Sequence, residues 1–185
     1  FGVNFTADKK TLLIIGGSLG ARTINQSIIA HLNELIESGI QVIWQTGKNY
    51  YSDCKAALGI LPHETVICTD FVSQMPLAYA LADLVISRAG ASSISELCLL
   101  GKPAILVPSP NVAEDHQTQN ALVNKNAAVL VKDSDAQNNL IATALQLIKD
   151  DQQLLNLHTN ILTLALPDSA RIIAAEVIKL AQKQE

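Results

Sequence analysis

The chain has 185 residues, of which 49% are hydrophobic and 16% charged, a composition that fits one globular domain with a full core and excludes a disordered chain. The formal net charge is −4 and no run of Lys and Arg forms a basic stripe, which argues against nucleic acid as a partner and against a polybasic membrane anchor in this part of the protein. No apolar stretch reaches the length that crosses a bilayer, and no secretory signal opens the sequence.

Short apolar runs alternate with segments of helical apolar spacing from one end of the chain to the other. The runs are bounded by glycine, proline or polar residues, which predicts buried strands, and the segments between them predict amphipathic helices. In chain order we expect a strand at Thr11–Ile15, a helix at about 21–38, a strand at Gln41–Gln45, a helix at about 50–58, a strand at Thr65–Thr69, a helix at Met75–Ala82, a strand at Leu84–Ser87, a helix at about 92–100, a strand at Ala104–Val107, a helix at about 114–125 and a strand at Ala127–Val131. From Ser134 onward we expect helix, with a break at Pro167-Asp168.

This alternation predicts an α/β fold, a doubly wound, Rossmann-like parallel sheet of six strands flanked by helices. Aromatic residues make up only 4% of the chain, and its aliphatic runs suit a sheet buried on both faces. No linker divides the sequence, so we expect residues 1–185 to form one domain. Right-handed crossovers would bring the loops at the carboxyl ends of the strands to one edge, where such sheets bind ligands.

The cysteines and histidines give no metal signature. Cys54, Cys68 and Cys98 have no CxxC spacing, which predicts reduced, buried thiols of a cytoplasmic protein. The histidines do not cluster in the sequence, so we expect no metal site and no protein-held cofactor.

A glycine-rich turn, Gly16-Gly17-Ser18-Leu19-Gly20-Ala21, joins the first strand to the first helix. Glycines permit positive φ and a close approach of backbone to ligand, and a helix start offers N–H groups to an anion. The same glycines would also serve a tight turn that binds nothing. The turn is neither a P-loop nor GxGxxG, and the second strand ends at Gln45 without the acid that holds a dinucleotide ribose.

A second turn of small residues, Arg88–Glu96 (RAGASSISE), follows the fourth strand and opens another helix. Two helix starts can converge on one diphosphate. Glu96 lies four residues after Ser92, and a carboxylate there can accept hydrogen bonds from both hydroxyls of a ribose. The Ser93–Glu96 spacing also fits a capping box, in which Glu96 would serve the helix itself.

Two further segments follow the third and fifth strands. Asp70–Pro76 (DFVSQMP) has apolar residues and backbone amides that suit a flat base, although packing under the sheet explains the same residues. After the fifth strand, Pro108-Ser109-Pro110 leads to the run EDHQTQNA, whose polar side chains suit sugar hydroxyls. Taken alone, His116, Gln117 and Asn120 are better explained as solvated positions near a helix start.

The four motifs in this order resemble the C-terminal domain of the MurG family, the donor-binding half of a GT-B glycosyltransferase. The motifs are GGSLGA, DFVSQM, RAGASSISE and EDHQTQNA, and the similarity runs from about Leu12 to the end of the chain. The resemblance implies that Arg88 matches an Arg at the strand end whose task is structural, and that His116 stands where some family members carry Gln. It also implies that the diphosphate is contacted by Gly17, Ser18, Gly20 and the backbone of Ala91, Ser92 and Ser93. The uracil would meet the Val72 main chain in a slot lined by Phe71 and Met75, and Glu96 would bind the ribose. Gln117, beside His116 and Asn120, would contact N-acetylglucosamine.

The family transfers N-acetylglucosamine from UDP-N-acetylglucosamine to the C4 hydroxyl of the N-acetylmuramyl residue of lipid I, with inversion, and forms lipid II in bacterial peptidoglycan synthesis. An N-terminal domain binds lipid I, supplies the catalytic base and associates peripherally with the cytoplasmic side of the inner membrane. Because the chain starts at Phe1, we expect it to lack that domain and an Arg that helps bind the nucleotide. We therefore expect a soluble fragment that has no catalytic residue, binds UDP-N-acetylglucosamine weakly and catalyses no transfer.

Other functions stay open on the residues alone. One is another UDP-sugar GT-B enzyme or a UDP-N-acetylglucosamine epimerase. A second is an NAD-binding oxidoreductase domain, which shares the sheet and the glycine-rich turn. That class carries an acidic residue at the end of the second strand, where this chain has Gln45. A third is a sugar-nucleotide sensor without a catalytic partner domain.

Overall fold

The computed structural model describes residues 5–17, 19–59, 64–110 and 122–182. Within these ranges the strands are β1 (Thr11–Ile15), β2 (Gln41–Gln45), β3 (Val66–Thr69), β4 (Leu84–Arg88), β5 (Ala104–Val107) and β6 (Val129–Leu130). They form one sheet of six strands in the order β3-β2-β1-β4-β5-β6, and every neighbouring pair is parallel. The predicted doubly wound α/β fold is thereby confirmed.

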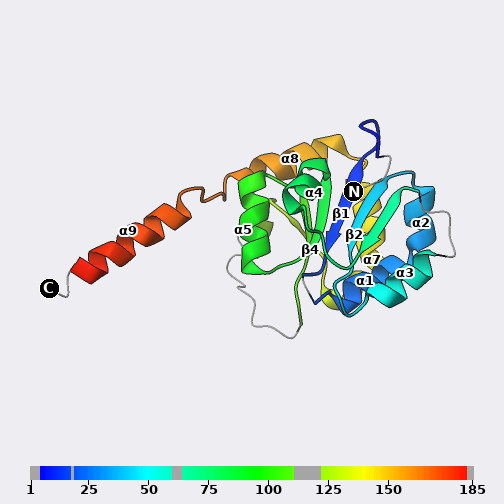
Figure 1. The fold of residues 1–185 in the computed structure, drawn as a ribbon. Helices are drawn as coiled ribbons and strands as arrows, with labels where there is room; N and C mark the ends of the chain where they lie inside the picture. Colours follow the sequence, from blue (N-terminus) through cyan, green and yellow to red (C-terminus); the bar gives the residue numbers. More distant parts are fainter. Residues whose placement is uncertain (1–4, 18, 60–63, 111–121, 183–185) are drawn as a thin grey trace.

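The helices in the described ranges are α1 (Arg22–Ala30), α2 (Leu32–Glu37), α3 (Tyr51–Leu58), α4 (Met75–Leu81), α5 (Ala91–Leu100), α7 (Ala136–Leu147), α8 (Asp151–Leu162) and α9 (Ser169–Gln182), with a short 3-10 turn, η1, at Asp133–Asp135. One core holds side chains of α1, α2, α3 and α7, and a second core holds side chains of α4 and α5, while α8 contributes to both. In Figure 1, α4 and α5 accordingly lie to one side of β1 and β4, and α1 and α3 to the other.

The central strands are buried on both faces because alternate side chains enter opposite cores. Leu12 and Ile14 of β1 pack with the α1 side, whereas Leu13 and Ile15 pack with the α4 and α5 side. All five residues of β1 are buried, as are all five of β2. This explains why the strands appear in the sequence as continuous apolar runs rather than as an alternation of apolar and polar residues.

Two helix predictions were wrong in their boundaries. The helix expected at about 21–38 breaks at His31, whose ring nitrogens lie 2.8 Å from Glu34 Oε1 and 2.9 Å from the Gln137 carbonyl oxygen, a tie to α7. The helix expected from Ser134 to Pro167 ends before Asp150, which begins α8 by accepting the Gln153 N–H at 3.0 Å. The Asp-x-x-Gln spacing at this position is the capping pattern that could have shown the second break.

Other boundaries shifted by smaller amounts. Strand β6 covers only Val129–Leu130 of the expected Ala127–Val131. The helix expected at about 114–125 lies mostly outside the described residues, and positions 122–124 are helical.

The cysteines are free, and none is fully exposed. Cys54 and Cys98 are buried and Cys68 is half-buried. Burial raises the pKa of the Cys54 thiol to about 12 and that of Cys68 to about 11, so both stay protonated at neutral pH.

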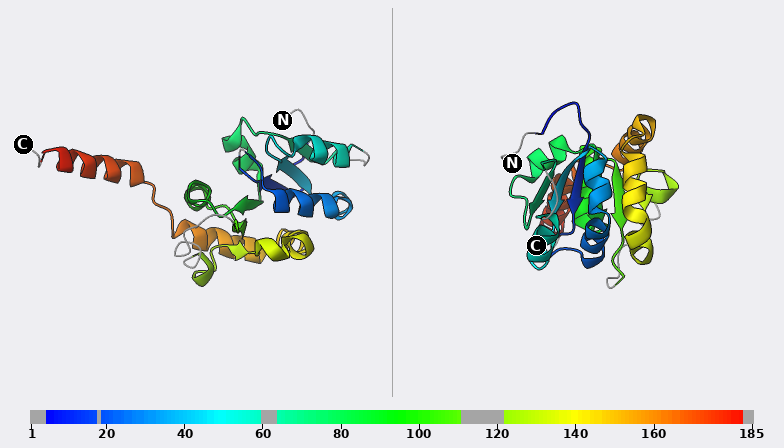
Figure 2. Two further views of the ribbon diagram at one scale, coloured as in Figure 1. Left: turned by 90° about the horizontal axis from the view of Figure 1, so that it is seen from below. Right: turned by 90° about the vertical axis from the view of Figure 1, so that its right-hand side faces the viewer.

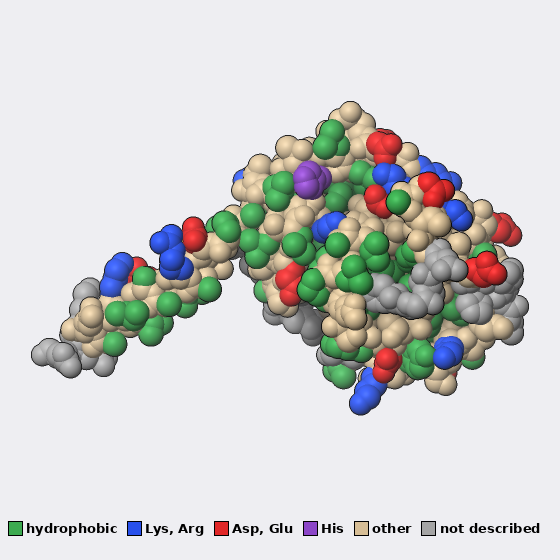
Figure 3. All heavy atoms as spheres, turned by 45° about the horizontal axis from the view of Figure 1, so that its top comes forward, with side chains coloured by type: hydrophobic (Ala, Val, Ile, Leu, Met, Phe, Trp, Pro, Cys, Tyr) green, Lys and Arg blue, Asp and Glu red, His purple; other side chains and the backbone are tan. Residues whose placement is uncertain are grey.

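Helix α9 stands apart from the two cores. It extends away from the sheet in Figure 1 and in the left view of Figure 2, and none of its residues is buried. Figure 3 shows apolar side chains along one flank of this helix, and its exposed apolar residues are Ile172, Ile173, Val177, Ile178 and Leu180. Within the described ranges no helix combines the length and apolar character needed to cross a membrane.

Removal of α9 should therefore leave the stability of the sheet unchanged. We expect a chain that ends at Leu166 to unfold within about 2 °C of the intact chain in a thermal scan, because none of the described residues that the deletion removes is buried. Leu140→Ala in the packed helix α7 is the contrasting change, with an expected cost of about 2–5 kcal/mol. A large drop in the melting temperature on deleting α9 would contradict this account of the core.

Candidate functional site

The glycine-rich turn and the turn after β4 lie side by side at the carboxyl edge of the sheet. Strand β1 pairs with β2 on one side and β4 on the other, so the chain changes direction between β1 and β4. In doubly wound sheets such a switch point opens a crevice between the two following loops, and ligands bind there. The structure thus brings together the two turns that the sequence singled out.

The first turn is shaped by two glycines with positive φ. Gly17 has φ +80° and Gly20 φ +83°, and the Gly20 N–H donates to the Gly17 carbonyl at 3.1 Å. A side chain on Gly20 would overlap the Thr46 carbonyl and the Tyr50 ring, whereas at Gly17 it would meet no described atom within 4 Å. Gly17 therefore faces open space, while Gly20 serves packing. Ser18, between them, lies outside the described residues.

Gln45, at the end of β2, joins this turn to the segment after β3. The residue is only 3% exposed, its Nε2 donates to the Gly17 carbonyl at 3.3 Å, and its Oε1 accepts the Val72 N–H at 3.0 Å. Sequence reasoning noted only that Gln45 is not acidic and missed this bridge. The signal for it was a polar amide at the last position of an otherwise apolar strand.

The segment after β3 divides into packed and exposed parts. Val72 is 2% exposed and Met75 packs against the same core, as ordinary packing would have them. Phe71 is instead 59% exposed, and its carbonyl accepts the Thr69 hydroxyl at 3.0 Å. Gln45 holds the Val72 N–H, and no hydrogen bond in the described ranges ends on the Val72 carbonyl, but at 2% exposure Val72 presents almost no main-chain surface in this structure.

Helix α5 starts at Ala91, and its cap residue is Gly90. Because Ser92 and Ser93 lie inside the first turn, Glu96 has no serine cap to pair with, and the capping-box explanation of Glu96 is wrong. Among the described residues no side chain caps α5 or α1, so the first N–H groups of both helices have no side-chain acceptor there. Ala91 and Ser92 are exposed and Ser93 is half-buried.

Glu96 is exposed on α5, and its Oε2 accepts a hydrogen bond of 3.0 Å from the hydroxyl of Tyr79 on α4. Burial raises the pKa of Tyr79, and the hydrogen bond and charge of Glu96 raise it further, so the phenol stays a donor at neutral pH. Glu96 and Tyr79 belong to the wall of an apolar hollow of about 370 Å³ between α4 and α5, whose other lining residues are Met75, Pro76, Ala80, Leu100 and Lys102.

Arg88 stabilises the edge of the site. Its guanidinium donates to the carbonyls of Val107 at 3.2 Å and Pro108 at 3.1 Å and pairs with Asp133. Asp133 also accepts the Thr23 hydroxyl at 2.9 Å, so the network joins the ends of β4 and β5 to η1 and α1. These bonds agree with the structural role expected for Arg88.

The remaining predicted residues can be placed only in part. His116, Gln117 and Asn120 lie outside the described residues, as does most of the polar run around them. Within the part of the chain that the structure describes, no group of three or more His, Cys, Asp or Glu side chains could hold a metal ion.

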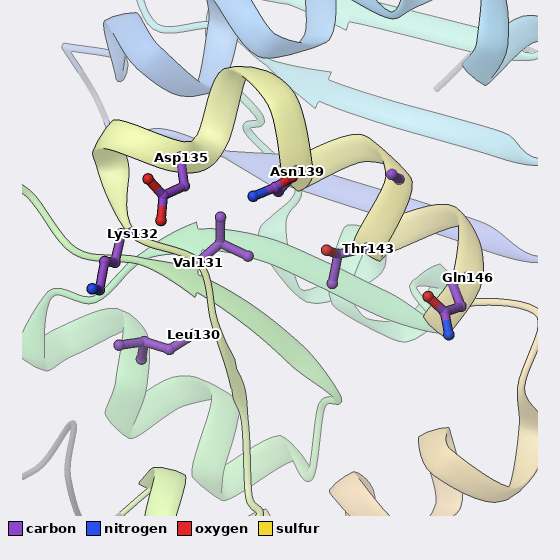
Figure 4. Close-up of a pocket in the computed structure, with 8 residues that line it drawn as sticks. Leu130, Val131, Lys132, Asp135, Asn139, Thr143 and Gln146 are labelled. Carbon is purple, nitrogen blue, oxygen red and sulfur yellow. The ribbon is translucent and has the colours of Figure 1, made fainter.

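A second hollow, of about 380 Å³, lies at the β6 edge of the sheet and contains no predicted site residue. Figure 4 shows Asn139, Thr143 and Gln146 along α7, beside the segment that carries Leu130 and Val131.

Comparisons with known proteins agree on one family. Residues 11–171 match the model of the glycosyltransferase family 28 C-terminal domain. The chain is 57% identical over 179 residues to a UDP-N-acetylglucosamine--N-acetylmuramyl-(pentapeptide) pyrophosphoryl-undecaprenol N-acetylglucosamine transferase of Parabacteroides distasonis, with 96% of this chain and 49% of that protein covered. The transferase of the same name from Bacteroides thetaiotaomicron is 59% identical, with 98% and 50% covered. The chain thus spans about half the length of these relatives.

Solved structures share the fold, and one of them belongs to the same family. The crystal structure of Acinetobacter baumannii MurG is similar with a TM-score of 0.77 and 32% identity, over 96% of this chain and 51% of that one. A putative UDP-N-acetylglucosamine 2-epimerase from Listeria monocytogenes has a TM-score of 0.69 over 97% of this chain and 47% of that one, but at 15% identity it shares the fold alone.

The Gln45 bridge can be tested by substitution. Gln45→Leu should lower the free energy of unfolding by about 1–3 kcal/mol, because the Val72 N–H and Gly17 carbonyl lose a buried partner. Hydrogen exchange of the Val72 amide should become faster. Gln41→Leu is the matched control, since Gln41 is also a buried β2 amide but bonds Thr11 at the opposite end of the strand. Equal Val72 protection in both variants would contradict the bridge.

Proposed function

The chain belongs to the glycosyltransferase family 28 C-terminal domains, and from this membership we propose that it is the donor-binding domain, formed by residues 1–185, of an N-acetylglucosaminyltransferase. The donor is UDP-N-acetylglucosamine, and the acceptor is the N-acetylmuramyl residue of lipid I, whose chemistry the names of the relatives describe. The observation that carries the proposal is the meeting of two helix starts, those of α1 and α5, at the switch point between β1 and β4. Neither helix start has a side-chain cap from the described residues.

The diphosphate binds between the two turns. Helix starts present N–H donors and a partial positive charge to an anion, and the two turns follow neighbouring strands. Added side chains at Gly17 and Gly90 would meet no described atom within 4 Å, which supports a backbone approached by ligand at both places. Ser18 and the backbone of Ala91–Ser93 complete this part of the proposal, as the family resemblance implies. Gly20, which the resemblance also places here, supports the turn instead, because its N–H is bonded to the Gly17 carbonyl and its Cα packs against Thr46.

The nucleoside lies over α5 and the segment after β3. Glu96 accepts hydrogen bonds from the ribose hydroxyls, a role supported by its exposed carboxylate and by the absence of a capping serine for it. The uracil contact with the Val72 main chain is proposed on the family resemblance alone, since Gln45 holds the Val72 N–H and the residue is buried. Exposed Phe71 and the start of α4 at Met75 flank the base. Gln117, His116 and Asn120 are proposed for the sugar on the resemblance alone.

Transfer needs groups beyond this chain. The acceptor hydroxyl attacks the anomeric carbon from the face opposite the leaving UDP, and inversion follows. The helix starts and nearby hydroxyls stabilise the charge on the departing diphosphate, with no protein-held cofactor in this half. Lipid I, the base that deprotonates the acceptor and the contact with the cytoplasmic membrane face belong to the other half of the enzyme. The isolated chain therefore binds donor but does not catalyse transfer.

Gln45 also argues against a dinucleotide-binding domain. In that class an acid at the end of the second strand holds the ribose. Here the position is an amide whose two polar ends are both bonded inside the protein, so it presents nothing to a ribose.

Calorimetric titration tests the proposal. We expect the chain to bind UDP-N-acetylglucosamine and not NAD, and Glu96→Ala to weaken binding about tenfold or more, because hydrogen bonds to a charged group are worth about 1.5–3 kcal/mol. Glu37→Ala is the matched control, since Glu37 is an exposed glutamate near the end of α2 and far along the chain from the proposed contacts. Binding of NAD, or equal donor affinity in Glu96→Ala and Glu37→Ala, would refute the proposed donor site.

A further inference from the structure

The hydrogen bond between Tyr79 and Glu96 joins a buried donor to an exposed acceptor. Tyr79 is 4% exposed and belongs to the core beneath α4 and α5, whereas Glu96 reaches solvent on the outer face of α5. A buried tyrosine hydroxyl requires a partner. Among the described residues, the bond that it makes is the one to Glu96 Oε2, at 3.0 Å.

This bond restricts a side chain that would otherwise move freely. An exposed glutamate on a helix samples several rotamers, and a ligand that binds it must order it. Tyr79 is fixed by its packing, so its hydroxyl holds the carboxylate in one place before any ligand arrives. Ordering in advance removes part of the entropic cost of binding.

The geometry leaves the carboxylate able to bind a diol. A carboxylate has about four acceptor sites on its two oxygens, and Tyr79 uses one on Oε2. The sites on Oε1 remain for two vicinal hydroxyls. Because the Tyr79 phenol keeps its proton at neutral pH, it does not compete with those hydroxyls as an acceptor.

Tyr79 also links this carboxylate to the segment proposed for the base. It lies one helical turn after Met75, the first residue of α4, which directly follows Phe71–Gln74. The same helix therefore carries the rim of the base slot at its start and the hydroxyl that holds Glu96 one turn later. Helix α4 therefore fixes the distance between the base slot and the hydroxyl that holds Glu96 of α5.

We propose that Tyr79 is a positioning residue for ribose recognition: its hydroxyl orients the Glu96 carboxylate toward the 2′ and 3′ hydroxyls of the nucleotide. The inference rests on the proposed function, because it presumes that Glu96 meets the ribose. On this proposal Tyr79 never touches the substrate. By orienting Glu96 it increases the preference of the site for a ribonucleotide over a 2′-deoxyribonucleotide.

Tyr79→Phe tests the proposal, because it removes the hydroxyl and keeps the packed ring. Titrations with UDP and with 2′-deoxy-UDP should show UDP affinity about three- to tenfold weaker in the variant, from the lost ordering of one glutamate side chain, and a smaller change for 2′-deoxy-UDP. Tyr51→Phe is the control, since the Tyr51 hydroxyl also bonds a neighbouring helix residue, Lys55, but on α3. A thermal scan checks that each variant is folded.

The double variant Tyr79→Phe/Glu96→Ala separates positioning from general stabilisation. If Tyr79 acts through Glu96, the double variant binds UDP as weakly as Glu96→Ala alone, with no further loss. Additive losses, or an unchanged ratio of UDP to 2′-deoxy-UDP affinity in Tyr79→Phe, would overturn the inference while the Glu96 contact stands. If Glu96→Ala itself leaves UDP affinity unchanged, the ribose contact of the proposed function fails, and the role of Tyr79 fails with it.

Discussion

The contact between the glycine-rich turn and the turn after β2 determines where the site can lie. A Cβ on Gly20 would overlap the Thr46 carbonyl, and one on Gly47 would overlap the Gly20 backbone, so the two main chains touch without a side chain between them. Asn25 supports this contact from α1 by donating to the same Thr46 carbonyl at 2.8 Å, and its own Oδ1 accepts the Trp44 indole N–H at 2.9 Å. The start of α1 is thus fixed against β2 by backbone packing and a buried polar chain.

Next to this contact between the turns after β1 and β2, the end of β2 is not available to bind a ribose. Gln45, at the end of β2, is turned inward and uses both ends of its amide on Gly17 and Val72. The strand position that serves the ribose in dinucleotide-binding sheets is therefore occupied by a structural bond here. On the proposed function, the protein carboxylate that binds the ribose must therefore come from the other side of the switch point. Glu96 on α5 lies on that side.

The sequence predicted the strands and the family, which depend on local patterns of residues. It did not predict hydrogen bonds between residues that are distant in the chain. The runs TLLII, QVIWQ and AILV became strands with the predicted bounds, because a strand buried on both faces needs an unbroken apolar run. The order of motifs indicated the family, which the match over residues 11–171 confirmed. The bonds Gln45–Val72 and Tyr79–Glu96 join residues 27 and 17 positions apart, and only the packing of strands and helices decides that they meet. The break at His31 likewise depends on a carbonyl of α7, which the local sequence does not contain.

The bonds that support the proposed nucleotide contacts all lie within this chain. The groups proposed for the diphosphate, ribose and base belong to β1–β4, α1, α4 and α5, and the bonds that hold them, at Gln45, Tyr79 and Asn25, all close within this chain. Helix α9 adds nothing to either core. On the proposed function, the groups of this chain that meet the diphosphate and ribose are therefore ordered by its own sheet and helices before any ligand binds.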